Sequence, residues 1–391
     1  MNVKSRVLKR LGWILFWVFI LHFIVEVTGH HYIYNTLSST VFEGRLGPGI
    51  LEYKDMPNRV IETGDAQPWK ISSDYNAASF NEEELSFHEE FGTVSFLVIK
   101  NDEIVFEEYW DDFDLESISN SFSMAKSVVG VLTGIAIKKG QIESVDKPAY
   151  WYLPQYESDL GEKMTIRHLL TMSSGINFDE SYINPFSFPA RANYGDNLEL
   201  LLRNYEVTEE PGEYFNYQSG GTQVLAFALK SVTRTSLSEY ASENLWKPLG
   251  AEHEALWSLD HEGGTEKAFC CINATARDFA RIGKLYLNNG RWNGVQIVDS
   301  AYVAASVSQQ QGLKNEDGSQ CEIYGYSWWL GEHKSKYFYM MRGILGQYVI
   351  VIPEDDIIVV RMGHKRKYGS GIPHPEDVFH YIDMAQRLTA E

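Results

Sequence analysis

Cysteine is scarce in this chain of 391 residues, which contains only Cys270, Cys271 and Cys321. Three cysteines are too few for a disulfide-stabilised scaffold, and the lack of a Cys-x-x-Cys pair argues against a thiolate zinc site. Cys270 and Cys271 are neighbours in the sequence, which is a poor geometry for pairing with each other. We therefore expect all three cysteines to be small buried residues.

Positive charge is also in short supply. The chain has 34 lysines and arginines against 53 aspartates and glutamates, which gives a formal net charge of -19. Nucleic-acid phosphates select basic surfaces, so this balance excludes nucleic acid as a partner. An acidic surface of this kind keeps a protein soluble through self-repulsion.

Several catalytic signatures are missing. The serine at Tyr217-Gln218-Ser219-Gly220 lacks the leading glycine of a G-x-S-x-G elbow, which argues against an α/β-hydrolase. His253 and His261 lie near acidic residues, but no H-E-x-x-H spacing is present, so we expect no metal site. No Walker motif or dinucleotide-binding glycine pattern occurs either, and we expect no cofactor.

The first 28 residues have the pattern of a membrane anchor. A basic leader over residues 1–10 precedes an apolar run over residues 11–28, which is interrupted by His22 and Glu26. A run of this length just suffices to cross a bilayer, and the basic leader predicts a cytoplasmic N-terminus. A cleaved signal peptide and a buried helix are the alternatives, but no small-residue cleavage site follows the run. We predict a single-pass anchor in the inner (cytoplasmic) membrane, with the rest of the chain periplasmic or extracellular.

The remaining chain has strand patterns early and late, with helical patterns between them. We predict a stem over residues 29–80, a sheet domain formed by residues 81–140 and 285–391, and a helical insertion domain over residues 141–284. This order indicates an α+β fold, in which an antiparallel sheet is flanked by helices and takes strands from both ends of the chain.

The segment Ser123-Met124-Ala125-Lys126 is an S-x-x-K motif at the start of a predicted helix over residues 119–140. Residues three apart share one face of a helix, so the lysine amine can approach the serine hydroxyl. A serine needs a base to become a nucleophile, and a lysine serves when burial or a neighbouring positive charge lowers its pKa. A second copy, at residues 144–147, precedes Pro148 and is interpreted as a chance match.

Two later segments suit the same chemistry. Tyr217 lies two residues before Ser219 in a turn that leads into a helix, and its phenol is a candidate proton shuttle. Gly343 follows a strand pattern near the C-terminal end, and a glycine there allows a ligand or another backbone to approach closely.

Taken together and in this order, these motifs resemble the class C β-lactamase and penicillin-binding-protein-like superfamily. The resemblance covers roughly residues 80–385. The segments over residues 165–176, 215–219, 273–281 and 343–347 are similar to the branch that contains 6-aminohexanoate-dimer hydrolases and related esterases. The resemblance implies a β-lactamase/transpeptidase-like fold.

The resemblance also implies roles for individual residues. Ser123 matches the acylated serine, Lys126 the lysine base and Tyr217 the tyrosine that relays a proton to the leaving group. The backbone N–H groups of Ser123 and Ile344 match the oxyanion hole. Three residues match the substrate-binding positions: Tyr182, Ser219 and Gly343.

Two departures from the family pattern bear on the substrate. The Tyr-x-Asn of β-lactamases is Tyr217-x-Ser219 here, and their Lys-Thr-Gly is Met341-Arg342-Gly343. Both departures count against a β-lactamase or a D-alanyl peptidase. We therefore predict a serine hydrolase that acts on a small-molecule amide or ester. A cell-wall peptidase or β-lactamase, and a catalytically silent binding protein, remain alternatives, and the oligomeric state stays open.

Overall fold

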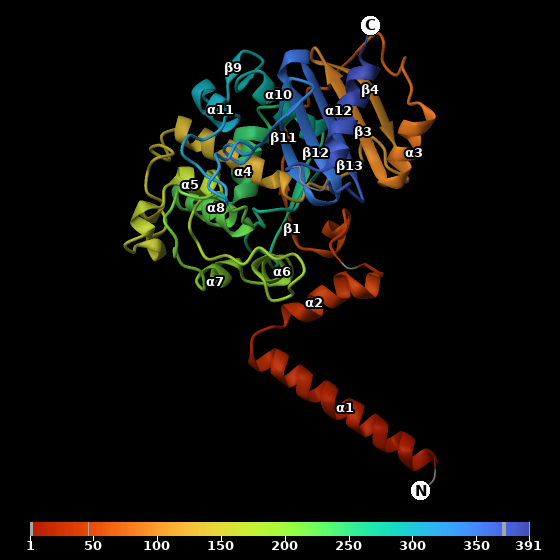
Figure 1. The fold of residues 1–391 in the computed structure, drawn as a ribbon, viewed down its shortest axis with the longest axis vertical. Coiled ribbons are helices and arrows are strands. Elements are labelled where there is room, and N and C mark those ends of the chain that lie inside the picture. The colour runs from red at the N-terminus through yellow and green to blue at the C-terminus, as the bar shows by residue number, and fades with distance from the viewer. Residues whose placement is uncertain (1–2, 46, 370–372, 391) are drawn as a thin grey trace.

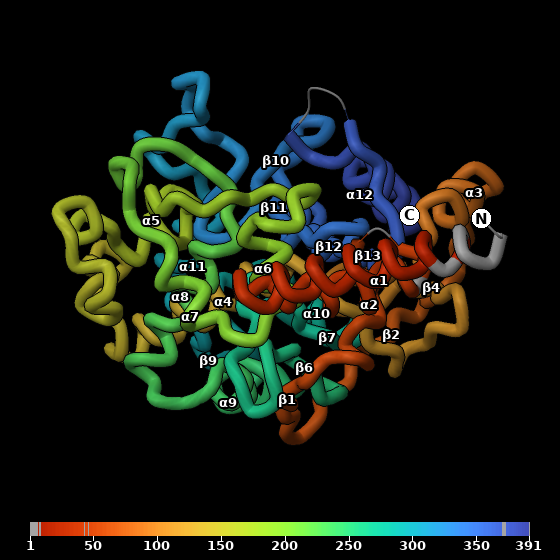
Figure 2. Tube along the Cα trace, turned by 90° about the horizontal axis from the view of Figure 1, so that it is seen from below, coloured from red at the N-terminus to blue at the C-terminus, as the bar shows by residue number. Residues whose placement is uncertain are grey.

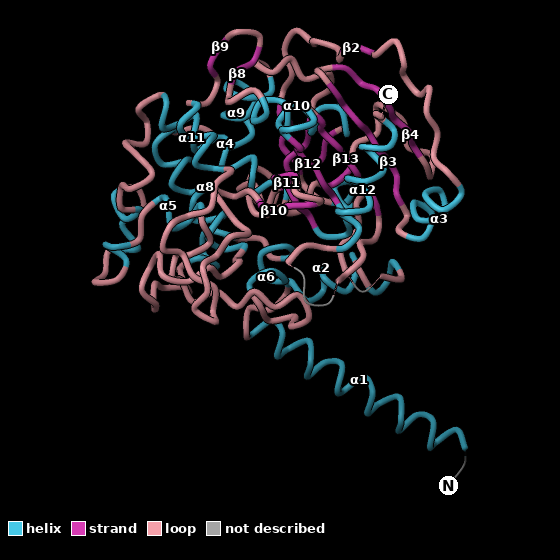
Figure 3. Tube along the Cα trace, turned by 45° about the horizontal axis from the view of Figure 1, so that its top comes forward, coloured by secondary structure: helices cyan, strands magenta, loops and turns pink. Residues whose placement is uncertain are grey.

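The structure is a computed structural model that describes residues 3–45, 47–369 and 373–390. Its central element is a seven-stranded sheet in the order β10-β11-β12-β13-β3-β4-β2 (Figures 1 and 3). Neighbouring strands run antiparallel except β2 and β4, which are parallel. The strands are β2 (Lys70–Ile71), β3 (Thr93–Lys100), β4 (Glu103–Tyr109), β10 (Trp329–His333), β11 (Lys336–Gly343), β12 (Gln347–Ile352) and β13 (Ile357–Gly363).

Both ends of the chain contribute to this sheet, as the sequence predicts. The late strand β13 pairs with the early strand β3, with Val359 opposite Val98. These strands are buried on both faces, which explains their nearly continuous apolar runs. The α+β prediction with a mainly antiparallel sheet flanked by helices is confirmed.

Two helical layers cover the sheet. Side chains that alternate along a strand point to opposite faces, so Leu97 and Val360 pack into one core while Phe96 and Val359 pack into the other. The first core lies against α4 (Met124–Lys138) and α10 (Ala276–Leu287), and the second against α12 (Glu376–Leu388). Helix α3 (Glu82–Glu90) begins with a capping box in which Asn81 and Glu84 bond each other's backbone N–H groups.

Figure 3 shows α5, α8 and α11 on the side of α4 away from the large sheet, with α6 below them, and the shorter helices complete this part of the molecule. These helices are α5 (Ile166–Leu170), α6 (Phe188–Tyr194), α7 (Leu198–Leu202), α8 (Ser219–Thr233), α9 (Leu237–Ala241) and α11 (Ser300–Ser306). Helices α5 and α8 pack on each other, and α8 packs on α4. This arrangement brings the N-terminal ends of α4 and α8, which carry the candidate site, into the same part of the molecule.

A second sheet, in the order β1-β6-β7-β5, was not foreseen from the sequence. Its strands are β1 (Asn58–Ile61), β5 (Ser119–Asn120), β6 (Ala255–Ser258) and β7 (Ile272–Ala274), and a separate hairpin joins β8 (Arg291–Trp292) to β9 (Val295–Gln296). The strands are short, and β1 pairs with a strand nearly 200 residues away, as Val60 opposite Leu256 shows. Pattern analysis has little signal for such pairs. The domain boundaries stay a prediction.

The N-terminal part extends away from this body. Helix α1 (Val3–Val27) projects from it, and α2 (Tyr32–Ser39) connects the two (Figure 1). Residues 9–27 of α1 are apolar, with mean hydropathy 1.8, and almost none of this stretch is buried. By length and composition α1 is able to cross a membrane.

Arg361 on β13 ties the loop after β11 to the rest of the sheet. Its fully buried guanidinium donates hydrogen bonds to the carbonyl oxygens of Leu345 (3.0 Å), Gly346 (2.9 Å) and Phe91 (2.7 Å). Leu345 and Gly346 both have positive φ, at 62° and 84°. The arginine therefore holds a tight turn directly after Gly343 in an unusual backbone conformation.

Replacing Arg361 with leucine should lower the free energy of unfolding by about 3 kcal/mol or more, because several buried carbonyl oxygens lose their donor. Urea unfolding of the detergent-solubilised protein, followed by tryptophan fluorescence, measures this loss. The matched control is Arg203→Leu, whose exposed pair with Glu199 should contribute less than about 1 kcal/mol. Equal effects of the two substitutions would contradict the role given to Arg361.

Candidate active site

Ser123 lies at the point where β5 turns into α4. Strand β5 is fixed by β7, because Ser119 pairs with Ala274, and Ser121 then donates its N–H to the carbonyl oxygen of Ile272 at 2.7 Å. Phe122 has a positive φ of 44°, an uncommon conformation for a bulky residue. This sharp turn places Ser123 as the N-cap of α4, where the helix dipole is positive.

Lys126 meets Ser123 as the S-x-x-K spacing predicts. Its Nζ donates to Ser123 Oγ and to the carbonyl oxygen of Phe269, each at 2.9 Å. The side chain is 1% exposed, and within the described part of the chain no carboxylate lies within 4.0 Å of the amine. A buried amine in contact with a serine hydroxyl is positioned to exchange a proton with it.

Tyr217 completes this group. The Lys126 Nζ lies over its ring, 5.0 Å from the ring centroid. On another side the ring packs against Trp329, at 5.1 Å between centroids. The structure therefore brings Ser123, Lys126 and Tyr217 together from segments almost 100 residues apart in the sequence.

Arg342 contributes a positive charge near the phenol. Its guanidinium carbon lies 3.2 Å from the centroid of the Trp329 ring, and Nη1 donates to the carbonyl oxygen of Pro373 at 3.1 Å. Burial lowers the pKa of Arg342 to about 10, and the nearby Tyr217 opposes this shift, so the guanidinium stays charged at neutral pH. The arginine thus brings a cation to the triplet in which β-lactamases carry a lysine.

Glu180 is a site residue that the sequence analysis did not identify. Its Oε1 accepts hydrogen bonds from the hydroxyls of Ser219 (2.6 Å) and Tyr182 (2.8 Å), and its Oε2 accepts from the N–H of Ser219 (2.7 Å). The carboxylate also caps the positive end of α8. In the sequence, the only indication that Glu180 belongs to the site is that it lies two residues before Tyr182. The fold alone shows that Glu180 lies beside Ser219.

Tyr182 and Ser219, both predicted to bind substrate, are therefore joined through Glu180. Tyr182 is 58% exposed overall, but its hydroxyl end is directed toward the protein. Packing around the phenol, the Glu180 charge and the neighbouring Tyr217 together raise the pKa of Tyr182. Tyr182 stays a neutral hydrogen-bonding group at physiological pH.

Gly343 lies at the end of β11, against the turn that carries Ser123. A Cβ atom at this position would lie 2.3 Å from the carbonyl oxygen of Ser121, so only glycine allows this approach. Ile344 follows directly and begins a 3-10 turn over Ile344–Gly346. Among the described residues, the N–H of Ser123 has no hydrogen-bond acceptor. The assignment of the Ser123 and Ile344 N–H groups to an oxyanion hole stays a prediction.

The expectation that Cys270 and Cys271 do not pair is wrong. The structure joins them in a disulfide, and Cys271 has a φ of 75°, a left-handed conformation that the sequence argument did not consider. Burial is as expected, because Cys270 and Cys271 are at most 7% exposed and the free Cys321 is fully buried. The disulfide directly follows Phe269, whose carbonyl oxygen accepts from Lys126.

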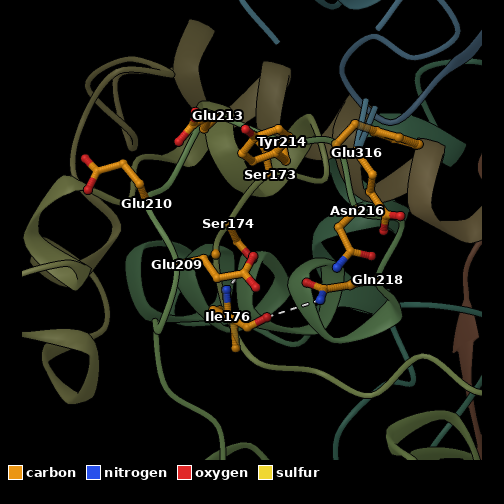
Figure 4. Close-up of a pocket in the computed structure, with 12 residues that line it drawn as sticks. Ser173, Ser174, Ile176, Glu209, Glu210, Glu213, Tyr214, Asn216, Gln218 and Glu316 are labelled. Atoms are coloured by element: carbon orange, nitrogen blue, oxygen red, sulfur yellow. Dashed lines mark hydrogen bonds between the residues drawn. The ribbon is translucent and has the colours of Figure 1, made fainter. Parts of the chain in front are cut away.

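A cavity of about 480 Å³ lies next to the site rather than in it (Figure 4). Asn216 and Gln218 line it, and Gln218 donates to the carbonyl oxygen of Ile176 at 3.1 Å. Successive residues of an extended segment point to opposite sides, so Tyr217 faces Lys126 and not this cavity. Within the described ranges no cluster of three or more His, Cys, Asp or Glu side chains could hold a metal ion.

The structure thus gathers a serine, a lysine and a tyrosine at one place, where the start of α4 lies beside the segment that leads into α8. The model of the Beta-lactamase family matches residues 80–377, so the chain belongs to that family. The family expectation is thereby confirmed.

Individual relatives agree with this assignment. The chain is 27% identical over 294 residues to a 6-aminohexanoate-dimer hydrolase from Paenarthrobacter ureafaciens, covering 70% of this chain and 73% of the relative. It is 25% identical over 259 residues to a putative D-alanyl-D-alanine carboxypeptidase from Escherichia coli, covering 58% of each. The structure of a putative 6-aminohexanoate-dimer hydrolase from Bacillus anthracis superposes with a TM-score of 0.71 at 23% identity, over 85% of this chain and 91% of that one.

Replacing Glu180 with glutamine should lower kcat/KM for p-nitrophenyl acetate on the order of tenfold to a hundredfold, because one acceptor oxygen becomes a donor that faces another donor. Steady-state kinetics measure the change in kcat/KM, and a thermal melt of the same preparation shows whether the variant is still folded. Glu209→Gln, at an exposed position on the rim of the neighbouring cavity, is the matched control and should change neither. Unchanged kinetics in Glu180→Gln would contradict the positioning role.

Proposed function

We propose that this protein is a serine hydrolase that cleaves a small amide or ester through an acyl-enzyme on Ser123. The observation that carries the proposal is the contact of the buried Lys126 amine with Ser123 Oγ, under the ring of Tyr217. An activated nucleophile requires a hydroxyl and a base within hydrogen-bond reach, and this pair meets that requirement. The relatives named as hydrolases support the same reaction class.

In the acylation step, Ser123 Oγ forms a bond to the substrate carbonyl carbon while its proton passes to Lys126 in the neutral amine form. The carbonyl oxygen becomes an oxyanion, for which the Ser123 N–H and the Ile344 N–H are the proposed donors. Collapse of this intermediate breaks the bond to the leaving nitrogen or oxygen, which takes the proton held by Lys126 through Tyr217. Water then attacks the acyl-enzyme: its hydroxyl bonds to the acyl carbon, its other proton passes to Ser123 Oγ as the ester bond breaks, and the acid is released.

The departures at Ser219 and Met341 favour an amidase or esterase over a β-lactamase or a cell-wall peptidase. Ser219 has a hydroxyl where the β-lactamases carry a side-chain amide, and both its hydroxyl proton and its N–H are donated to Glu180. The cation near Tyr217 comes from Arg342, which lies over Trp329. Tyr182, Ser219 and Gly343 are the proposed contacts for the substrate.

A fluorophosphonate should label the protein once, on Ser123, as shown by intact mass and peptide mapping. Ser123→Ala should abolish labelling, and Lys126→Ala should slow it by about a hundredfold or more because the base is lost. Ser144→Ala, in the second S-x-x-K copy, is the matched control and should label normally. Undiminished turnover in Ser123→Ala would refute the mechanism, and stable binding of a penicillin would instead favour the cell-wall enzymes.

We further propose that α1 anchors the protein in the cytoplasmic membrane, with the hydrolase body outside the cytoplasm. An apolar helix with a mean hydropathy of 1.8 over residues 9–27, almost wholly exposed, is unfavourable in water and suits a bilayer. The basic residues before it set the orientation. An oxidising compartment outside the cytoplasm allows the Cys270–Cys271 disulfide to form.

Carbonate washing of membranes should leave the full chain in the pellet, and deletion of residues 1–28 should move the protein to the soluble fraction. The mass of the membrane-bound protein should retain the N-terminal segment. If the mature protein is lighter than the full chain by about the mass of a signal peptide, the N-terminal segment is a cleaved leader instead.

A further inference from the structure

The loop over residues 181–187 carries the predicted substrate contact Tyr182 and exposes an unusual amount of apolar surface. Ile183 is 95% exposed and Phe186 is 56% exposed. Nothing in the proposed catalytic cycle uses these two side chains. A loop beside an active site that presents them to water indicates a partner that is itself apolar.

The loop is closed by its own polar groups. Asn184 donates its N–H to Ser181 Oγ at 3.1 Å and accepts the N–H of Phe186 on its Oδ1 at 3.0 Å. Ser187 Oγ donates to the carbonyl oxygen of Asn184 at 2.7 Å. Because these groups are paired within the loop, its apolar tip can leave water at little cost in unsatisfied hydrogen bonds.

The outer side of the loop rests on the segment that leaves α1. Tyr32 donates its hydroxyl to the carbonyl oxygen of Pro185 at 3.0 Å, and the rings of His30 and Phe186 lie 5.5 Å apart. His30 is three residues beyond the end of α1. Figures 1 and 2 both place α6, which directly follows the loop, beside the body-side end of α1.

The inner side of the same loop contacts residues that lie next to the proposed reacting group. The Tyr182 hydroxyl donates to Glu180, and Glu180 accepts from Ser219, two residues after Tyr217. A single short loop therefore links the exit of the anchor to the group that contains Ser123 and Lys126.

We propose that the loop over residues 181–187 lies in the outer surface of the membrane, and that Ser123 acts on amides or esters that carry a hydrocarbon chain and reside there. This rests on the anchoring and the hydrolase activity proposed above. A helix that ends at Val27 puts His30 and Phe186 at the level of the lipid headgroups, where aromatic side chains are favoured. Ile183 then enters the boundary of the acyl chains, and a chain-bearing substrate reaches Tyr182 without crossing bulk water.

The charge of the chain limits the kind of membrane contact. A formal net charge of -19, with Asp179 and Glu180 beside the loop, disfavours attraction to anionic lipids, and Arg191 is a basic residue whose charge acts on Tyr32 on the outer side. Apolar insertion must supply the contact, so vesicles of phosphatidylcholine alone should suffice.

The first test measures the depth of the loop. The full-length protein with Ile183→Cys, labelled with an environment-sensitive fluorophore, is reconstituted in phosphatidylcholine vesicles that contain a lipid with a spin label near the headgroup. We expect at least a twofold loss of fluorescence. Val295→Cys is the matched control, because Val295 is 61% exposed in β9, at the end of the body far from α1 (Figure 1), and should not be quenched. The native protein controls for labelling of other cysteines. Equal quenching at both positions, or none at Ile183→Cys, would overturn the proposal.

The second test concerns the substrate. In the same vesicles, Ile183→Asp combined with Phe186→Asp should lower kcat/KM for p-nitrophenyl laurate about tenfold and change that for p-nitrophenyl acetate less than twofold. Val295→Asp should change neither. Equal losses on both esters, or no loss on either, would refute a membrane-borne substrate. A native protein inactive on both esters and unlabelled by fluorophosphonate would refute the hydrolase function itself, and the quenching test would still decide the position of the loop.

Discussion

The pair of hydrogen bonds made by the Lys126 amine is the interaction on which the rest of the site depends. A buried amine without a carboxylate partner is costly unless hydroxyl or carbonyl oxygens satisfy it. Ser123 Oγ and the Phe269 carbonyl oxygen do so here. Both are held by the small sheet, because β5 leads into Ser123 and Phe269 lies just before β7. The pairing of β5 with β7 is therefore a condition for the proposed chemistry and not only for the fold.

The seven-stranded sheet also holds part of the site, through Gly343 at the end of β11. Gly343 can approach the carbonyl oxygen of Ser121 because it has no side chain, and the turn that follows it is held by the buried Arg361. The arginine lies on β13, which pairs with β3 from the early part of the chain. Packing of the sheet, the turn at Leu345 and the surroundings of Ser123 are thus mechanically connected. A substitution at Arg361 would therefore change the position of the turn that contains the proposed oxyanion donor Ile344.

The loop that contains Tyr182 connects this site to the outside. At one end Glu180 joins the loop to the start of α8, and at the other Tyr32 joins it to the segment beyond α1. Neither contact is strong by itself, but together they fix the loop between two rigid elements. The position of Tyr182, the proposed substrate contact, is then set jointly by the body of the protein and by the segment that follows its N-terminal helix.

The sequence by itself determined the features that depend on local spacing or on composition. Ser123 and Lys126 share a helix face because they are three residues apart, and the apolar strands and α1 follow from continuous runs of apolar residues. The motif order was sufficient for the family, and the α+β class follows from strands at both ends of the chain.

Only the tertiary structure decided the contacts between distant segments. It brought Glu180 to Ser219, Lys126 to the carbonyl oxygen of Phe269, and β1 to β6, none of which has a local signature. It also joined Cys270 to Cys271 through a left-handed backbone at Cys271, against the expectation from their adjacency. The reason is the same in each case. Such contacts depend on how chain segments far apart in sequence pack, or on a backbone conformation imposed by that packing, and neither is encoded in the neighbouring residues.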